Sequence, residues 1–271
     1  MKVSQINSTD YRYKPTYKGI TRAVYNPHSI DNGIRLIGTL KHRNNSWLLR
    51  PKADVCIRQY SYFSQAFPGS EKVNIYNYAC SLGYESYGWI LWMLAGHEKH
   101  PEKFLPIIAK DYDADIIKAA KEFILPLTED EIAAAKAIIP RGTFEDFFNV
   151  DYGIRDDILI DTPYHGYFAK PTQKLTENIQ FSVADIRRDY KNIEPERSIV
   201  LAANFWPYLK KGERYALAEN LYKQLAKGSL VKIGEEFDNN RIALNDLKSV
   251  SEILSGVGFK RSDEFKNIYI R

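Results

Sequence analysis

Short apolar runs alternate along the chain with stretches whose apolar residues recur at helical spacing. The runs are typical of buried strands, and they are VNIYNYAC (73–80), FLPIIAKD (104–111), NIQFSVAD (178–185), SIVLAAN (198–204), SLVKIGE (229–235) and KNIYIR (266–271). Helical spacing occurs at 86–95, 114–124, 128–138, 212–226 and 247–258. Strands that alternate with helices of this length predict βαβ units, and therefore an α/β fold with a mostly parallel sheet.

Two regions interrupt this alternation. Residues 44–66 have helical spacing in part, with a break at Pro51, and the stretch from about 140 to 175 is rich in aromatic residues and turns. We expect the second region to be a small insertion ahead of the strand at 178–185. The helix at 128–138 has a defined predicted start, because Thr128 and Glu131 have the spacing of a capping box.

The composition is that of a globular domain with an uneven charge. Hydrophobic residues make up 44% and charged residues 27%, which supports a buried core and excludes a disordered chain. Residues 1–60 contain 11 Lys and Arg against 3 Asp and Glu, a net +8, so the remainder carries −4 of the chain's +4. We therefore divide the chain into a basic, Tyr-rich N-terminal segment (1–65) and a main domain (66–271).

The N-terminal segment has two interpretations. Basic residues mixed with aromatic ones, as in YRYKPTYKGITRAVY (11–25), can bind nucleic acid. The same composition also describes a solvated arm, and the segment contains no recognisable nucleic-acid-binding motif.

Cysteine use and the N-terminus predict an intracellular protein. Cys56 and Cys80 are the two cysteines, so no disulfide framework is expected. The N-terminus lacks the apolar core of a signal peptide, and no apolar run approaches the ~18 residues of a membrane span. We expect a cytoplasmic protein.

In an open parallel sheet, ligands bind beyond the carboxyl ends of the strands. The first connection of this kind, 79–85, contains Gly83 just ahead of a helix whose free N–H groups would favour an anion. Neither GxGxxG nor GxxxxGK occurs in the chain. By itself the connection therefore indicates either a cofactor site or a plain corner.

The second strand ends at Asp111, 28 residues beyond Gly83, where ~20 is usual for a dinucleotide-binding fold. A carboxylate in this place commonly accepts two hydrogen bonds from ribose hydroxyls. The alternative role, the N-cap of the helix at 114–124, suits Asp113 better and leaves Asp111 for a ligand.

Other candidate residues are weaker. Asn204 ends the strand at 198–204, either as a polar group facing a ligand or as a turn residue. The five His residues show no metal-ligand spacing, so we expect no metal site. Cys80 has no indicated His partner and is interpreted as a packed residue, and GxSxG is absent.

Six segments, taken in order, resemble the chemotaxis receptor methyltransferases of the CheR type. NIYNYACSLGYESYGWILWMLA resembles the first motif of that family, W-x-A-x-C-S-T-G-E-E-P-Y-S, with matches at Cys80, Ser81, Gly83, Glu85 and Tyr87. The other segments are NNSWLLRPKA, IIAKDYDADIIKAA, YFAKPTQKLTENIQFSVADI, VLAANFWPYL and LAKGSLVKIGEEFD. The resemblance runs from about residue 44 to the end.

The resemblance implies an enzyme that uses S-adenosyl-L-methionine and has a class I, Rossmann-like methyltransferase fold. This fold has a mostly parallel seven-stranded sheet whose last strand is antiparallel. The insertion at about 140–175 would be the small β subdomain that docks the receptor in some members. The family's acceptor is a glutamate carboxylate, which is ionised at neutral pH because its reference pKa is about 4.3, and which needs no catalytic base.

The resemblance also implies roles for individual residues. Asp111 would hold the cofactor ribose, Gly83 and Glu85 would lie beside its methionine part, and Asn204 would support it near the reaction centre. Tyr208 and Arg50 would be catalytic. The further implied cofactor contacts are Ser46 and Arg50 as a cover, Asp185 and Ile186 at the adenine, and Ala79, Tyr112 and Phe205.

Several positions depart from the family pattern. Ala203 stands where the family has an Arg before its Asn, Ser229 replaces a turn glycine, and the E-E-P of the first motif reads Tyr84-Glu85-Ser86. Three functions therefore stay open: methylation of a protein carboxylate, methylation of a small molecule or RNA, and cofactor binding without catalysis.

Overall fold

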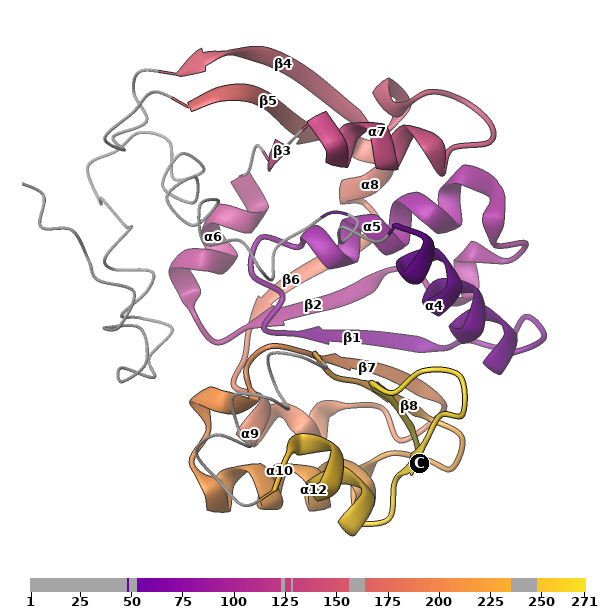
Figure 1. The fold of residues 1–271 in the computed structure, drawn as a ribbon, viewed down its shortest axis with the longest axis vertical. Coiled ribbons are helices and arrows are strands. Elements are labelled where there is room, and N and C mark those ends of the chain that lie inside the picture. The colour runs from indigo at the N-terminus through magenta and orange to yellow at the C-terminus, as the bar shows by residue number, and fades with distance from the viewer. Residues whose placement is uncertain (1–47, 49–52, 123–124, 128, 156–163, 235–247) are drawn as a thin grey trace, which may run out of the picture.

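The computed structural model describes residues 48, 53–122, 125–127, 129–155, 164–234 and 248–271. At its centre, seven strands of the described chain form a sheet in the order β6-β2-β1-β7-β8-β10-β9 (Figure 1). The strands are β1 (Asn74–Tyr78), β2 (Ile107–Asp111), β6 (Ile179–Val183), β7 (Ser198–Ala202), β8 (Leu230–Lys232), β9 (Lys260–Arg261) and β10 (Ile268–Ile270).

The pairing confirms the predicted fold class. The neighbours β6-β2-β1-β7-β8 pair in parallel, whereas β10 runs antiparallel to both β8 and β9. The strand expected at 104–111 begins three residues later, at Ile107. Residues 101–103 form a 3-10 turn, and the N–H of Phe104 still donates to the Pro101 carbonyl at the end of this turn. β1 lies between β2 and β7, which makes the gap between β1 and β7 the switch point of the sheet, where open α/β folds bind ligands.

Helices cover both faces of the sheet, and each face has its own apolar core (Figure 1). Alternation along β1 sends Ile75 to one core and Tyr76 and Tyr78 to the other. The helices on the first face are α4 (Ala53–Ala66), α5 (Tyr84–Trp92), which continues as the π-helical turn η2 (Met93–His97), and α6 (Ala114–Glu122). Those on the second face are α9 (Ile186–Asp189), α10 (Lys211–Gln224) and α12 (Val250–Gly256).

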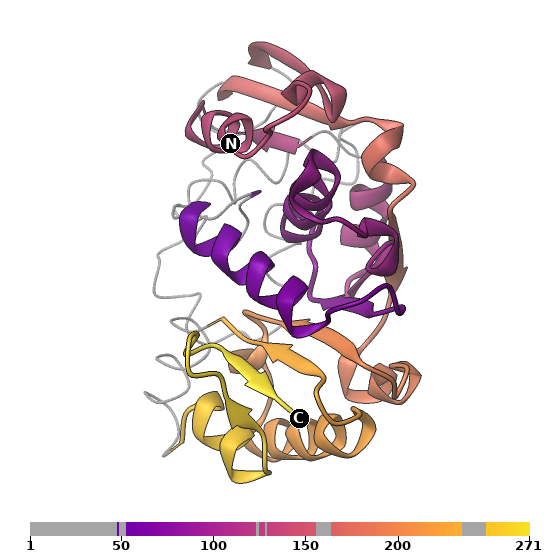
Figure 2. The same ribbon diagram turned by 90° about the vertical axis from the view of Figure 1, so that its right-hand side faces the viewer.

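Helix α4 is packed into the main core, and Figure 2 shows it lying along the sheet. The ring of Tyr60 lies 4.5 Å from that of Trp89 in α5, and Phe63 stacks on the same indole at 4.9 Å. Aromatic pairs at such distances add about 0.5–1.5 kcal/mol each beyond the area that they bury. The domain boundary that we predicted at 65/66 thus falls at the end of a helix that shares the core of the main domain.

The predicted insertion contains a separate antiparallel sheet in the order β3-β5-β4. Its elements are β3 (Leu125–Leu127), β4 (Phe148–Arg155), β5 (Tyr164–Pro171), α7 (Glu129–Ala137), α8 (Gln173–Thr176) and the 3-10 turn η4 (Phe144–Asp146). The small sheet thus includes a strand upstream of the expected 140–175. It lies at the opposite end of the molecule from the C-terminus in both views (Figures 1 and 2).

Leu48 packs directly against α5. Its side chain is buried, and its backbone N–H donates to Oε1 of Glu131 in α7 at 3.2 Å. A β-carbon at Gly88 of α5 would lie 2.1 Å from the Leu48 carbonyl oxygen. The absence of a side chain at Gly88 therefore makes room for the backbone that leads to Arg50.

We expect Gly88→Ala to lower the free energy of unfolding by about 2–3 kcal/mol, because the new methyl group would meet a backbone oxygen that cannot move alone. Urea denaturation measures the change. The matched control is Gly212→Ala in α10, where a β-carbon meets no atom within 4 Å, so its effect should be neutral or slightly stabilising. A Gly88→Ala variant as stable as the parent would contradict the Leu48 contact.

Candidate functional site

The carboxyl ends of the parallel strands form one edge of the main sheet, which we call the carboxyl edge. The loops after β1, β2, β6, β7 and β8 all start there. Ten of the residues predicted for the site are brought to this edge: Ala79, Gly83, Glu85, Asp111, Tyr112, Asp185, Ile186, Asn204, Phe205 and Tyr208. Ser46 and Arg50, which were predicted to cover the cofactor, lie outside the described residues.

The connection from β1 to α5 has an unusual backbone. Ala79, Ser81 and Gly83 have φ values of 55°, 52° and 85°, so alternate residues are left-handed. Non-glycine residues in this region cost about 1–3 kcal/mol each, and such strain tends to occur at functional sites. At Gly83 a β-carbon would also lie 2.6 Å from the tip of the Phe181 ring, so a larger residue there would have to displace that ring. The connection is thus a tightly built corner as well as a candidate site.

Asp111 holds this corner against β2. It is 2% exposed, its Oδ2 accepts from the Ser81 N–H at 2.9 Å, and its Oδ1 accepts from the Asp113 N–H at 3.0 Å. Burial raises the pKa of Asp111 to about 6, even though these hydrogen bonds lower it. A carboxylate has about four lone-pair sites, so acceptor capacity remains for a ribose hydroxyl.

The division of roles between the two aspartates is confirmed in part. Asp113 starts α6, since its Oδ1 accepts from the N–H groups of Asp115 at 2.9 Å and Ile116 at 3.4 Å. Asp111 takes no part in this cap, as predicted, but the sequence did not indicate its bonds to the backbone of the neighbouring corner.

Two large hydrophobic side chains are exposed near Asp111, one next to it in the chain and one opposite it in the sheet. Tyr112 is 46% exposed and Val183 is 54% exposed, and Asp111 and Val183 are register partners in β2 and β6. Within the described chain, these are the exposed large hydrophobic residues. The guanidinium of Arg187 lies over the Tyr112 ring, 5.9 Å from its centroid. Isolated exposed hydrophobic residues are normal at a protein surface, but exposed aromatic and aliphatic side chains near a buried carboxylate are candidates for contact with a flat heterocycle.

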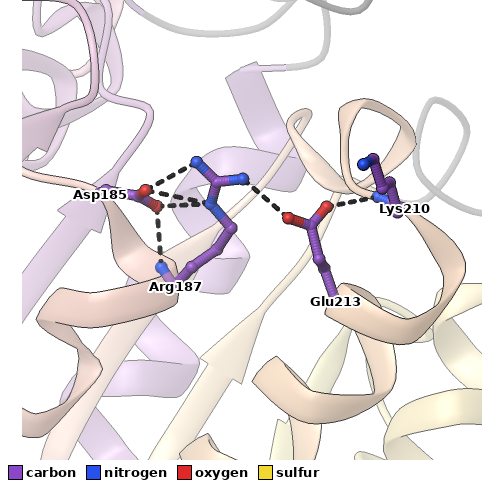
Figure 3. Close-up of polar contacts among 4 residues, drawn as sticks. All are labelled: Asp185, Arg187, Lys210 and Glu213. Carbon is purple, nitrogen blue, oxygen red and sulfur yellow. Dashed lines mark hydrogen bonds and ion pairs between the residues drawn. The ribbon is translucent and has the colours of Figure 1, made fainter.

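Asp185 and Ile186 begin the neighbouring helix α9. Asp185 is its N-cap, and its carboxylate also binds the guanidinium of Arg187 through two nitrogens, at 2.7–3.0 Å (Figure 3). Arg187 continues to Glu213 at 2.8 Å, and Glu213 accepts from the backbone N–H of Lys210 at 2.7 Å (Figure 3). Burial alone would raise the pKa of Asp185, but the hydrogen bonds from Arg187 outweigh it and lower this pKa. The network joins the starts of α9 and α10.

The loop after β7 carries the residues predicted near the reaction centre. Asn204 has a φ of 70°, and Phe205 stacks on Trp206 in the 3-10 turn η6 (Trp206–Tyr208) with centroids 5.2 Å apart. The loop is fastened from two sides, since Trp206 Nε1 donates to the Ala202 carbonyl at 2.7 Å and Arg214 Nε to the Trp206 carbonyl at 3.1 Å. Tyr208 is half-buried at the end of this loop.

Sequence reasoning missed one charged residue at the carboxyl edge, Lys232. It is the last residue of β8, it is 5% exposed, and its Nζ forms an ion pair with Oε1 of Glu85 in the first turn of α5. The signal was present in SLVKIGE, because a lysine inside a buried strand requires a partner. The distance of 147 residues between the partners hid its identity.

Other chemistry at this edge is limited. Cys80 is buried, and burial raises the pKa of its thiol well above the usual value, in agreement with its interpretation as a packed residue. Of the histidines, His97 and His100 follow α5 and His165 lies in β5. Within the described ranges, no group of three His, Cys, Asp or Glu could hold a metal ion, and no helix is long and apolar enough to cross a membrane.

Comparison with protein families shows the family to which the chain belongs. Residues 59–253 match the family described as CheR methyltransferase, SAM binding domain. The chain belongs to the CheR methyltransferase family. It is therefore an S-adenosylmethionine-dependent methyltransferase, as the resemblance implied.

Solved structures show more distant likenesses to this CheR-family chain. A TehB-like SAM-dependent methyltransferase from Corynebacterium glutamicum is 13% identical, with 90% of this chain and 97% of that chain covered and a TM-score of 0.42. A SAM-dependent methyltransferase from Archaeoglobus fulgidus is 11% identical, with coverages of 83% and 74% and a TM-score of 0.39. The SAM-bound amino pentose methyltransferase CalS10 from Micromonospora echinaspora is 10% identical, with coverages of 73% and 54% and a TM-score of 0.35. No curated protein matches the chain significantly.

The residues present suit the parts of S-adenosylmethionine. Tyr112 and Val183 are exposed apolar groups of the kind that an adenine contacts, and Asp111 is the neighbour of Tyr112 in the chain and the register partner of Val183. Glu85 in the first turn of α5 and Lys232 at the end of β8 form an ion pair, and their opposite charges match the two charges of a zwitterionic amino-acid tail. The carboxyl edge of this CheR-family enzyme therefore fits the cofactor of its family.

Proposed function

We propose that this CheR-family enzyme methylates a carboxylate on an acceptor protein, with an O-methyl ester as the product. The observation that carries the proposal is the lack of a free base among the described residues of the carboxyl edge. Among the described histidines, His97 and His100 follow α5 and His165 lies in the small sheet. Burial raises the pKa of the Cys80 thiol, and Lys232 is paired with Glu85. An amine or hydroxyl acceptor has to lose a proton, whereas a carboxylate is already ionised at neutral pH.

The reaction then needs positioning rather than proton transfer. The bound cofactor supplies a methyl group activated by a sulfonium. A carboxylate oxygen of the acceptor forms the new C–O bond, the C–S bond breaks, and its electron pair stays on sulfur, which gives S-adenosylhomocysteine. The protein has to hold the carboxylate in line with the methyl group and exclude water, and the fixed loop from Asn204 to Tyr208 is suited to this.

Within this proposal the predicted residues keep the roles that the resemblance implies, and the cofactor contacts Ala79, Tyr112 and Phe205 are now given a place. Asp111 would bind the ribose, Tyr112, Asp185 and Ile186 would surround the adenine, and Ala79, Gly83 and Glu85 would hold the methionine part. Asn204 and Phe205 would lie near the reacting methyl group, and Tyr208 and Arg50 would face the acceptor. Ser46 and Arg50 are proposed from the sequence resemblance alone.

The test is methyl transfer from labelled S-adenosylmethionine to candidate acidic proteins. We expect incorporated label that is released as methanol by mild base, because methyl esters hydrolyse there and methylamines do not. A matched acceptor whose candidate glutamates are replaced by glutamine should take up no label. Base-stable label would contradict the ester assignment and leave the methyltransferase assignment in place.

A second acceptor class, RNA, is favoured by the charge of the N-terminal segment, which is +8 over residues 1–60. The support for RNA is the composition of these residues, most of which lie outside the described part of the chain. RNA binding that weakens steeply with salt and disappears on removal of residues 1–40 would support it.

A further inference from the structure

The ion pair between Lys232 and Glu85 crosses the switch point of the sheet. Lys232 ends β8, β7 lies between β8 and β1, and Glu85 stands in the first turn of the helix that follows β1. Lys232 is the register partner of Leu201, and Leu201 in turn pairs with Asn77. The lysine side chain therefore reaches across β7 to meet a residue that β1 positions, at the gap where ligands of such sheets bind.

The pair is largely withdrawn from water, since the side chains are 7% exposed for Lys232 and 21% for Glu85. Buried ion pairs are weak sources of stability, because desolvation of both charges offsets their attraction. Ser86, next to Glu85, is also fixed, through its hydroxyl bonded to Asn77 Nδ2 at 2.9 Å. A paired charge held rigidly at the ligand edge is therefore better explained by recognition than by folding.

A zwitterion is the ligand that such a pair can accept at the lowest electrostatic cost. Insertion of an ammonium beside Glu85 and a carboxylate beside Lys232 replaces one ion pair by two and leaves no buried charge without a partner. We propose that Lys232 is a specificity-determining residue that binds the carboxylate of the donor's amino-acid tail, while Glu85 receives the ammonium. This inference rests on the use of S-adenosylmethionine by the enzyme, and it assigns a residue of β8 to the cofactor site.

The experiment compares three nucleosides by titration calorimetry on the full chain. S-adenosylhomocysteine carries both charges, S-adenosyl-3-thiopropylamine lacks the carboxylate, and 5′-methylthioadenosine lacks the whole tail. We expect the first to bind about tenfold to hundredfold more tightly than the second, as for a hydrogen bond between charged groups. Lys232→Met should abolish this difference and leave the affinity for 5′-methylthioadenosine unchanged.

Lys103→Met serves as the matched control. Lys103 is also a buried lysine in an ion pair, with Glu98 at 3.6 Å and both side chains 4% exposed. It lies in the turn that precedes β2, and its carbonyl accepts from the N–H of Val73 just before β1, so it is at the other edge of the sheet. It should leave the ratio of the three affinities as in the parent. If Lys232→Met does not fold, two other measurements test the role of Lys232. They are the preference of the parent for the nucleoside that carries the carboxylate, and the loss of this preference in Lys232→Gln.

The failures are distinguishable. Equal affinity of the parent for the nucleosides with and without the carboxylate, or equal weakening of both by Lys232→Met, would overturn the role of Lys232. Absence of heat with all three nucleosides would overturn the cofactor assignment, and this inference with it.

Discussion

Lowering the pH through about 6 should weaken donor binding and at the same time stabilise the ligand-free protein. Both effects come from Asp111, whose pKa is raised to about 6 by burial. Ribose hydroxyls donate to the ionised carboxylate, so affinity should fall by up to about tenfold per pH unit below 6. The folded state binds this proton more tightly than the unfolded state does. Protonation between pH 6 and 4 therefore removes the free-energy cost of the buried charge and raises the stability of the folded protein. This relief amounts to roughly 3 kcal/mol at most.

Calorimetric titration of S-adenosylhomocysteine from pH 5 to 8, with urea denaturation over the same range, measures both effects. Asp111→Asn should lower the affinity about tenfold to hundredfold at pH 7.5 and remove its dependence on pH, because the amide has one acceptor oxygen and no charge. If the variant binds as well as the parent, the ribose is held elsewhere. If the variant keeps the parent's pH profile, another group titrates.

Removal of the Asp189 carboxylate should cost about 3–5 kcal/mol of stability. Asp189 Oδ2 accepts from Lys110 Nζ and from the Tyr78 hydroxyl, both at 2.6 Å, and the ion-paired side chains are 11% and 15% exposed. Asp189→Ala leaves the largely buried ammonium of Lys110 without its counter-charge. Loss of one partner of a buried ion pair lowers stability more than replacement of both partners by apolar residues. Because Asp189 is the last residue of α9, the variant should also loosen the helix that carries Asp185 and Ile186.

Urea denaturation of Asp189→Ala measures this cost, with Glu219→Ala as the control. Glu219 pairs with Lys223 at the surface, where the side chains are 55% and 73% exposed, so its loss should change stability by less than about 0.5 kcal/mol. The double variant Lys110→Met, Asp189→Leu should recover much of the loss. A similar loss in the double and the single variant would contradict the ion-pair argument.

The pH dependence of this second site has the opposite sign. Burial alone would raise the pKa of Asp189, but hydrogen bonds from Lys110, Tyr78 and Asn192 outweigh it and lower the pKa. Its contribution to stability is therefore present above the carboxylate's ordinary pKa and is lost as the pH falls through the lowered value. Parent and Asp189→Ala should thus converge in stability at low pH.

Most of the fold could be predicted because its signals are local. The apolar run at 198–204 contains β7, the helical spacing at 114–124 contains α6, and Asp113 was identified as the cap of α6 from its position alone. The capping box of α7 remains a prediction, since Thr128 lies outside the described residues. Glu131, its other predicted member, accepts from the N–H of Leu48, a contact that the sequence around α7 does not indicate.

The site was predictable only in outline. Placing Asp111 at the end of a strand followed from the run FLPIIAKD, but its bond to the Ser81 N–H depends on β1 and β2 lying side by side. The sequence left open whether the connection at Gly83 is a cofactor site or a plain corner, and it did not indicate that a β-carbon there would meet the ring of Phe181, in a strand about a hundred residues away.

By itself, the sequence determined where most strands and helices of the main sheet form, and it indicated that the candidate site residues would follow the carboxyl ends of the parallel strands. Periodicity, capping and the match of short motifs depend on neighbours in the chain, so they can be read without the fold. The tertiary structure alone decided that Lys232 meets Glu85, that Gly88 admits Leu48, and that Asp111 supports a corner. A buried charge or a missing side chain shows that a partner is needed, but only the order of the strands brings a particular distant residue within contact.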